Sequence, residues 1–388
     1  MTATSSQKAY DVAIVGAGIV GLAHALAASR LGKRVIVIDR DAAANGASIR
    51  NFGFITVSGQ QRGQCWDRAV RSRNIWAEIA PKAGIRIEHS GLLVAARRPE
   101  AHALLEAFAG TDMGRDCRIV TPRVARDKVP MINADSIVGA LWSPHELRVE
   151  SRDALPRFSH WLAETQGVEF MRSTLVRDIA LPQLMTTRGT LFAERVIVCP
   201  GHDLLSLFAD RIATYNLTTC KLQMMRLAPL GTTPKLGAAV MSDLGLVRYL
   251  GYAELPEAAA LKARLAIEQA PHLDNGVHLI VVQSADGSLV VGDSHHYGET
   301  LDPFAPNAID ELILDEFDRV FACPEYRVSE RWTGTYASSS DCLMLVDRPS
   351  ANVRIVIVTS GTGASTAFAI GEEVVAELFD SQSNGVVA

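Results

Sequence analysis

The feature that most constrains this fold is a glycine-rich turn between an apolar strand and a helix near the N-terminus. The turn reads Gly16-Ala17-Gly18-Ile19-Val20-Gly21; the apolar run 10–15 precedes it and a helical pattern over 19–31 follows. A β-branched run at 34–39 completes a strand–turn–helix–strand unit, which predicts a parallel sheet. In such a unit the three glycines permit the tight turn, the approach of a pyrophosphate to the backbone, and close packing of the helix on the strand.

An acidic residue stands where a dinucleotide-binding unit needs one. Asp39 ends the second strand, 18 residues after Gly21, where a carboxylate can accept a hydrogen bond from a ribose 2′-hydroxyl. The acid also disfavours a 2′-phosphorylated cofactor. The alternative is a glycine-rich turn in an unrelated α/β protein, and the combination of strand, glycines and acid makes it the weaker interpretation. The unit alone does not separate FAD from NAD.

Charge and cysteine content exclude several classes of protein. The net charge of −5 at pH 7 offers no basic face for nucleic acid or an anionic membrane. The six cysteines are scattered and form no C-x-x-C pair, so we expect no metal site and reduced thiols, as in a cytoplasmic protein. The apolar stretch 12–28 could suggest a signal peptide or a membrane span. We reject both because the dinucleotide unit explains its glycines.

Apolar periodicity predicts further elements along the chain. Helical patterns cover 70–83, 100–109, 153–165, 257–269, 308–321 and 364–379, and strand-like runs cover 195–199, 221–227, 278–283, 288–292 and 354–358. From about residue 214 to 328 the pattern changes, which indicates a second sheet of mixed or antiparallel strands.

Three later segments carry glycines in patterns that suit a cofactor. They read Gly46-Ala47-Ser48-Ile49-Arg50-Asn51-Phe52-Gly53-Phe54, Val196-Ile197-Val198-Cys199-Pro200-Gly201, and Thr359-Ser360-Gly361-Thr362-Gly363-Ala364-Ser365-Thr366 followed by Gly371-Glu372. Together with the first turn they resemble the FAD-dependent D-amino-acid-oxidase superfamily, in particular its glycine oxidase and sarcosine oxidase branch, over nearly the whole chain. The resemblance favours FAD, because NAD would need no second glycine turn near the C-terminus.

The resemblance implies a set of cofactor-binding residues. Ser48 would donate to the pyrophosphate, Gly53 would let the backbone approach the flat flavin ring, and the helix after Gly363 would stabilise negative charge on the flavin. Cys199 could be a redox thiol, but a small buried apolar cysteine is the favoured interpretation. The expected cofactor residues are Gly16, Gly18, Ile19, Val20, Gly21, Asp39, Arg40, Ala47, Ser48, Asn51, Gly53, Val176, Cys199, Gly201, Gly334, Gly361, Thr362, Gly363, Ala364 and Ser365.

The resemblance also implies a discontinuous architecture. The fold class is α/β, with a Rossmann-like FAD-binding domain that carries an inserted α+β substrate domain built on a mixed or antiparallel sheet. Because three distant motifs must meet on one dinucleotide, the FAD-binding domain should comprise 10–90, 140–214 and 330–380. The substrate domain should comprise 91–139 and 215–329, with flexible termini at 1–9 and 381–388.

Several positions depart from the resembled family. The cysteine that tethers flavin in sarcosine oxidases falls near Gly334, so we expect noncovalent FAD. A lysine that binds the substrate carboxylate is matched by Ser365, and the arginine of glycine oxidases falls near Trp332. The lysine expected near flavin N5 falls roughly at Val291. A different residue must therefore hold the substrate anion, and Arg50 is our first choice.

The segment Gly292-Asp293-Ser294-His295-His296-Tyr297-Gly298 resembles the strand end that carries an active-site histidine in sarcosine oxidases. His295 could hold the amine or carry a proton, since imidazole titrates near neutrality. The alternative is a pair of solvent-facing histidines, and for each arginine it is a structural salt bridge. The expected catalytic residues are His295 and Arg50, and the expected substrate-binding residues are Arg50, Asn51, Phe54, Lys221, His295, His296, Arg331 and Trp332.

These patterns predict an FAD-dependent amine oxidase. It would oxidatively deaminate or N-dealkylate a small anionic amine and pass electrons to O2, giving H2O2. The pairing of the segment 48–53 with 292–295 resembles a subgroup associated with aminophosphonate breakdown, which suggests an aminoethylphosphonate or its N-methyl form. Two alternatives stay open: a flavin dehydrogenase of an N-methyl or simple amino acid with another acceptor, and a non-catalytic flavin-binding subunit. We expect a monomer or a small homo-oligomer.

Overall fold

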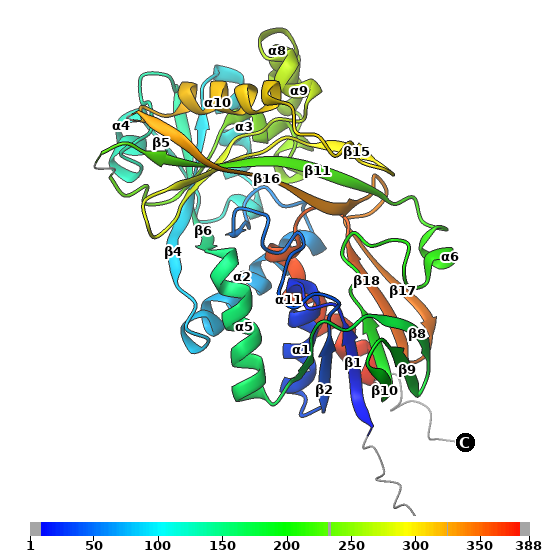
Figure 1. The fold of residues 1–388 in the computed structure, drawn as a ribbon. Helices are drawn as coiled ribbons and strands as arrows, with labels where there is room; N and C mark the ends of the chain where they lie inside the picture. The colour runs from blue at the N-terminus through cyan, green and yellow to red at the C-terminus, as the bar shows by residue number, and fades with distance from the viewer. Residues whose placement is uncertain (1–8, 232–233, 324, 381–388) are drawn as a thin grey trace, which may run out of the picture.

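Two lobes, each built on one β-sheet, make up the molecule (Figure 1). The computed structural model describes residues 9–231, 234–323 and 325–380. The expected flexible termini, 1–9 and 381–388, lie outside these ranges except for Ala9. Within the described ranges, the structure contains no helix with the length and apolar character needed to cross a membrane.

The first lobe contains an eight-stranded sheet. Its order is β17-β18-β10-β1-β2-β7, and the five strands from β18 to β7 run parallel, as the strand–turn–helix–strand pattern predicts. Strands β8 and β9 form an antiparallel extension of β10, and β17 lies antiparallel to β18. The strands are β1 (Tyr10–Val15), β2 (Val35–Ile38), β7 (Glu169–Met171), β8 (Val176–Ala180), β9 (Gln183–Thr186), β10 (Gly189–Val198), β17 (Met344–Ser350) and β18 (Val353–Val358).

Four helices share one hydrophobic core with this sheet. They are α1 (Ile19–Arg30), α2 (Gln64–Lys82), α5 (Ser151–Gln166) and α11 (Gly363–Asp380). Trp76, Phe158 and Phe368 meet in this core, and the rings of Trp76 and Phe368 lie 5.1 Å apart edge to face. The short helix α6 (Ala209–Ile212) lies near the other face. The core therefore fixes α1 and α11, whose N-terminal turns both face the interior between the lobes.

The second lobe contains a mixed ten-stranded sheet. Its order is β15-β11-β14-β13-β12-β4-β6-β3, with β16 paired to β11 and β5 paired to β6. Only the β12–β4 pair is parallel among the pairs described. The strands are β3 (Phe54–Ile55), β4 (Ile87–Ala96), β5 (Arg118–Val120), β6 (Gly139–Val149), β11 (Thr218–Pro229), β12 (Ala239–Met241), β13 (Ile280–Gln283), β14 (Leu289–Gly292), β15 (His296–Gly298) and β16 (Tyr326–Ser338).

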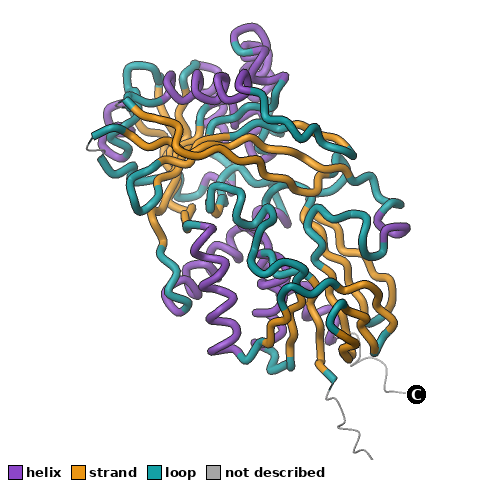
Figure 2. The backbone as a smooth tube through the Cα atoms, viewed as in Figure 1, coloured by secondary structure: helices purple, strands orange, loops and turns teal. Residues whose placement is uncertain are grey.

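Helices, drawn in purple in Figure 2, pack on both faces of the second sheet, because one set shares a core with Leu92 and Val94 of β4 and another set shares a core with Leu93 and Ala95 on the opposite face. They are α3 (Pro99–Ala109), α4 (Pro122–Lys128), α7 (Leu250–Ala253), α8 (Ala258–Glu268), α9 (Ala270–Asp274) and α10 (Asn307–Val320), with short 3₁₀ helices η1 (Asp112–Gly114) and η2 (Asp243–Val247). The expected fold class, an α/β dinucleotide fold joined to a mixed-sheet domain, is confirmed. Each helix expected from periodicity is present, although α2 begins six residues before the expected Val70.

Sheet membership differs from the expected domain boundaries at four places. Two of them, β3 at 54–55 and the first part of β4 at 87–90, lie within the expected range 10–90 of the FAD-binding domain but pair within the ten-stranded sheet. Residues 139–149 form β6, and 326–338 form β16, so both segments pair within the ten-stranded sheet. The expected division assigned 140–149 and 330–338 to the FAD-binding domain. The difference arises because β16 is one long strand that starts in the second lobe and reaches the first, where Ser338 forms a β-bridge with Ser360. A sequence pattern marks a strand but does not show which sheet it joins.

Candidate functional site

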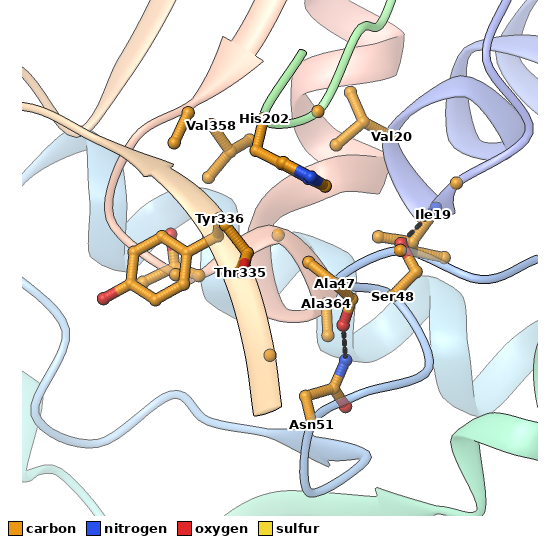
Figure 3. Close-up of a pocket in the computed structure, with 18 of the residues that line it drawn as sticks. Ile19, Val20, Ala47, Ser48, Asn51, His202, Thr335, Tyr336, Val358 and Ala364 are labelled. Carbon is orange, nitrogen blue, oxygen red and sulfur yellow. Dashed lines mark hydrogen bonds between the residues drawn. The ribbon is translucent and has the colours of Figure 1, made fainter. Parts of the chain in front are cut away.

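A cavity of about 530 Å³ lies between the two lobes. Its walls come from segments far apart in the sequence: the β1–α1 turn, the loop 44–52, the chain after β10, the end of β16, and the turn before α11. Figure 3 shows side chains from these segments facing one space, including Ile19, Ser48, His202, Tyr336 and Ala364. The three-part assembly expected from the motifs is thus present at this cavity.

The β1–α1 turn has the geometry of a dinucleotide-binding turn. Gly16 has φ +106°, and a Cβ there would lie 2.3 Å from the carbonyl oxygen of Cys199, so only glycine fits. The N-cap residue of α1 is Gly18, which has no side chain to cap the helix. The backbone N–H of Ile19 donates to Ser48 Oγ at 2.9 Å, which brings the loop 44–52 against the helix start. A helix N-terminus at a cavity wall, with a serine hydroxyl beside it, suits a pyrophosphate.

Asp39 is held at the same end of the cavity. Its Oδ2 accepts from the N–H of Ala17 at 2.5 Å, and its Oδ1 accepts from the N–H of Asp41 at 2.8 Å. Cys199 also lines the cavity, and burial raises the pKa of its thiol far above the usual range, so the thiol stays protonated. That state agrees with a small apolar cysteine rather than a redox thiol.

The turn before α11 is anchored from two sides. Trp76 Nε1 donates to the carbonyl of Ala364 at 2.8 Å, and Ser365 Oγ accepts from the N–H of Thr56 at 2.9 Å. Gly361 has φ +72°, and a Cβ there would lie 3.3 Å from the ring of Tyr336. The first turn of α11 is therefore fixed at the cavity wall, where its amides and dipole can stabilise negative charge.

Every expected cofactor residue lines the cavity except Gly53. Gly53 has φ +66°, and a Cβ there would lie 1.8 Å from the carbonyl oxygen of Val149. Its lack of a side chain thus serves the packing of the loop on the end of β6, and the expected contact with a flat ring is not supported. The residues that do line the cavity are Gly16, Gly18, Ile19, Val20, Gly21, Asp39, Arg40, Ala47, Ser48, Asn51, Val176, Cys199, Gly201, Gly334, Gly361, Thr362, Gly363, Ala364 and Ser365.

Four polar residues from the second lobe line the opposite end of the cavity, and we call them the inner cluster: Arg248, His278, Asp293 and His295. Arg248, just after η2, is partly buried, and one of its terminal nitrogens donates to the hydroxyls of Tyr297 at 3.0 Å and Tyr336 at 3.4 Å. The other three side chains are between 3% and 7% exposed. The cluster thus brings one permanent positive charge and three titratable groups to one end of the cavity.

Strand pairing sets the geometry of the inner cluster. His278 and Asp293 exchange backbone hydrogen bonds of 3.1 and 3.0 Å, which continues the β13–β14 ladder and puts their side chains together. His278 Nδ1 lies 3.3 Å from Asp293 Oδ1, and His295 Nε2 lies 3.9 Å from Asp293 Oδ2. His295 Nδ1 lies 2.9 Å from the carbonyl of Gly276. A carbonyl only accepts, so Nδ1 carries the proton and a neutral His295 presents a lone pair at Nε2.

Burial controls the protonation of these groups. It raises the pKa of Asp293 to about 8, although the positive charge of Arg248 opposes the rise. It lowers the pKa of His278 and of His295 well below the usual range, and Arg248 lowers both further. In the cavity at neutral pH the two imidazoles are therefore neutral, and the carboxyl of Asp293 titrates close to the pH of the solvent.

Half of the expected substrate residues lie at this cavity. Arg50, Asn51, Phe54 and His295 line it. The guanidinium of Arg50 donates to Asn45 Oδ1 at 2.9 Å and to the carbonyl of Thr333 at 3.4 Å.

The other four expected substrate residues do not line the cavity. Lys221 Nζ donates to the carbonyls of Asp302 and Phe304 at 2.5 and 2.7 Å, so it ties down a loop. Arg331 Nε pairs with Asp310 at 2.6 Å on the outer face, and Arg152 lies over the ring of Trp332. His296 Nε2 contacts Asn275 Oδ1 at 3.2 Å. Strand alternation explains Lys221, Arg331 and His296, since neighbouring residues on a strand face opposite sides. Trp332 shares its face of β16 with Gly334 and Tyr336 but lies farther along the strand, beyond the residues that line the cavity.

Sequence reasoning missed most of the inner cluster. His278 was expected only as the start of a strand, and Asp293 only as a neighbour of His295. Arg248 follows a short 3₁₀ helix and belongs to no motif. The sequence did offer one signal for the pair His278 and Asp293. They stand at the outer ends of two consecutive expected strands with a short connection, and such strands bring their outer ends together when they pair.

A family model described as FAD dependent oxidoreductase matches residues 11–378. The chain belongs to this family. FAD is therefore the cofactor, and the enzyme class is that of an FAD-dependent oxidoreductase. The glycine turn at Gly16, the start of α1 and the carboxylate of Asp39 fit the dinucleotide. They offer close backbone approach, a helix N-terminus at the cavity wall, and a ribose acceptor.

Two proteins with sequences similar to this FAD dependent oxidoreductase are named as oxidases of small amino acids. The chain is 26% identical over 206 residues to a glycine oxidase of Geobacillus kaustophilus (strain HTA426), covering 50% of this chain and 54% of that protein. It is 22% identical over 205 residues to a monomeric sarcosine oxidase of Arthrobacter sp. (strain TE1826), covering 51% and 52%. The chain thus spans about half the length of the curated relatives it matches.

The fold similarity extends further than the sequence similarity. The crystal structure of an L-proline dehydrogenase from P. horikoshii superposes with a TM-score of 0.76 at 18% identity, covering 96% of this chain and 94% of that chain. Both lobes of this FAD dependent oxidoreductase therefore belong to one shared fold.

Proposed function

We propose that this protein oxidises the carbon–nitrogen bond of a small anionic amine, and that Arg248 holds the anionic group. The observation that carries the proposal is the side chain of Arg248. It is a permanent cation in the wall of the cofactor cavity, and among the described residues it donates hydrogen bonds to tyrosine hydroxyls rather than to a carboxylate. A cation without an ionic partner in a partly closed site favours an anionic ligand.

FAD, when bound, accepts a hydride from the carbon next to the substrate nitrogen, and the resulting imine hydrolyses in water. This chain would orient the amine between Arg248 and the cofactor end of the cavity, with Phe54 and Leu222 providing apolar walls. The named activities of the glycine oxidase and the sarcosine oxidase support an amine that carries an acid group. The product would be an aldehyde or keto acid together with ammonia or a shorter amine.

The finer part of the proposal concerns the acid group. A guanidinium can donate two parallel hydrogen bonds to two oxygens, so Arg248 suits a carboxylate or a phosphonate. An aminoethylphosphonate or its N-methyl form remains our proposed substrate, because two hydroxyls beside Arg248 add donors for a third oxygen. Arg50 lines the same cavity and is the second choice, since its guanidinium already donates to Asn45 and to Thr333.

The test is to substitute Arg248 and to measure how fast amines reduce the bound flavin without oxygen. The amines are glycine, sarcosine, 2-aminoethylphosphonate and its N-methyl form. Losing one charged contact in a closed site costs about 2–4 kcal/mol, so Arg248→Gln should lower the efficiency of reduction on the order of a hundredfold. Arg331→Gln, outside the cavity, is the matched control and should stay within about threefold of the wild type. Bound FAD should remain in both variants.

Two results would redirect the proposal. Unchanged kinetics in Arg248→Gln, with a large loss in Arg50→Ala, would move the anion to Arg50. Stoichiometric H2O2 during turnover would support O2 as the acceptor, whereas substrate-reduced flavin that persists in air would favour the dehydrogenase alternative.

A further inference from the structure

The side chains of Asp293, His278 and His295 face one another without being fully hydrogen-bonded. Among the described residues, His278 Nδ1 and Asp293 Oδ1 are buried atoms with no hydrogen-bond partner, although they lie 3.3 Å apart. His295 is oriented by the Gly276 carbonyl, and its Nε2 is directed at Asp293. Buried polar atoms left unpaired are costly, so their presence at a cavity wall suggests a chemical use.

We propose that Asp293, flanked by His278 and His295, accepts the proton of the substrate ammonium before oxidation. The proposal rests on the proposed function. A simple amine is largely protonated at neutral pH, and its nitrogen needs a lone pair before the neighbouring carbon can lose a hydride. In this step one N–H bond of the ammonium breaks, its electron pair stays on nitrogen, and the proton forms an O–H bond on the Asp293 carboxylate. No oxidant or other reactant is consumed.

The two histidines stabilise the protonated form of the carboxyl group. A protonated Asp293 can donate its O–H to a lone pair of a neutral imidazole, and the geometry offers this at His278 Nδ1 and at His295 Nε2. An ionised Asp293 attracts the ammonium directly. Because burial raises the pKa of Asp293 to about 8, the group can exchange protons near the working pH, which is the condition for efficient general acid–base catalysis.

Arg248 couples this proton transfer to binding of the substrate anion. Its positive charge lowers the pKa of Asp293, His278 and His295 in the free protein. An anion bound to Arg248 would neutralise that field and raise the proton affinity of all three groups when the ammonium arrives. The other titratable groups that act on this site are Tyr249, Tyr297, Tyr336, Cys220 and His296, and Lys221 acts on His296.

A divalent cation is the competing use of the same side chains. The ligand atoms of His278, Asp293 and His295 all lie within 4.8 Å of one another, a spacing that a metal could also accept. Arg248 weighs against it, because its permanent charge acts on all three residues and would repel a second cation. The proton-accepting role needs no additional positive charge.

The test compares an ordinary amine with one that is already neutral. 2-Aminoethylphosphonate, or its N-methyl form if that is the better substrate, is paired with its analogue fluorinated on the carbon next to phosphorus. Fluorine lowers the pKa of the amine, and the assay pH is set above that pKa so that the fluorinated amine is unprotonated. Asp293→Asn should slow anaerobic flavin reduction by the ordinary amine on the order of a hundredfold or more. It should slow reduction by the fluorinated amine less than about tenfold, because no proton has to be removed.

The pH profile gives a second readout. In the wild type, reduction by the neutral analogue should vary little with pH. Reduction by the ordinary amine should rise as the pH increases through about 8, because the carboxylate form of Asp293 becomes available. In Asp293→Asn, the rise that comes from ionisation of Asp293 should disappear. The rise that comes from deprotonation of the amine in solution should stay.

Controls separate the possible failures. His278→Gln should show a smaller loss of the same kind, and His160→Gln, on the exposed surface of α5, should stay within about threefold of the wild type; the His278 variant also replaces Asp293→Asn as the test if that variant fails to bind FAD. Equal slowing of both amines, or none, overturns the proton-accepting role. A stoichiometric metal in the purified protein whose removal abolishes activity overturns it too. Wild-type flavin that no amine reduces rejects the proposed function itself.

Discussion

Single residues at the cofactor end of the cavity are constrained more tightly than their neighbours. Gly16 has both a positive φ and a backbone oxygen 2.3 Å from where a Cβ would lie, whereas Gly32 has a positive φ of +69° but nothing within 4 Å. The first position therefore excludes a side chain by contact and by conformation, and the second by conformation alone.

Gly16→Ala should consequently lose FAD. The added methyl group must push the turn away from Cys199, which displaces the backbone that would approach the pyrophosphate. We expect FAD content per mole of purified protein to fall at least about tenfold, since strained φ alone costs about 1–3 kcal/mol and the clash adds to it. Gly32→Ala is the matched control and should keep its FAD with a modest drop in melting temperature. Full FAD occupancy in Gly16→Ala would contradict this account of the turn.

At the scale of elements, α1 and α11 pack so closely that their contact requires glycine. A Cβ on Gly371 would lie 2.9 Å from the backbone carbon and oxygen of Ala23. This contact, with the hydrogen bond from Trp76 to Ala364, positions two helix N-termini at one cavity.

Gly371→Ala should therefore destabilise the protein although alanine is the better helix former. Helix propensity favours alanine by about 1 kcal/mol, but overpacking against backbone costs about 1–3 kcal/mol, so the net effect should be destabilising. Gly110→Ala, at the end of α3 with its nearest contact at 3.4 Å, should change stability little. The measurement is the melting temperature of each FAD-loaded variant compared with that of the wild type. A higher melting temperature for Gly371→Ala would show that α1 and α11 can separate freely.

The same elements show what the sequence could and could not reveal. The turn from Gly16 to Gly21 was predictable, because its glycines, strand and helix are contiguous in the chain. His278 and Asp293 meet only through the pairing of β13 with β14, and Arg248 reaches them from a 3₁₀ helix that no periodicity marks. Gly53 was assigned to the flavin because a required glycine can serve packing or a ligand, and the sequence does not distinguish these uses.

At the scale of the whole molecule, the two lobes divide the chemistry. The eight-stranded lobe supplies the dinucleotide turn and the start of α11, and the ten-stranded lobe supplies the inner cluster. Strand β16 belongs to the second sheet yet carries Gly334 and Tyr336 to the shared cavity. Because Gly334 stands where the resembled sarcosine oxidases have a tethering cysteine, noncovalent FAD remains a prediction.

The most direct test of this account mixes the FAD-loaded protein anaerobically with matched amines and follows flavin absorbance. 2-Aminoethylphosphonate, its N-methyl form, glycine and sarcosine carry an anion, whereas ethylamine and N-methylethylamine lack one. At least one anionic amine should bleach the flavin, and its anion-free counterpart should do so on the order of a hundredfold more slowly, because it makes no contact with Arg248. Flavin that stays oxidised with every amine, or that the amines without an anion reduce equally fast, would contradict the account.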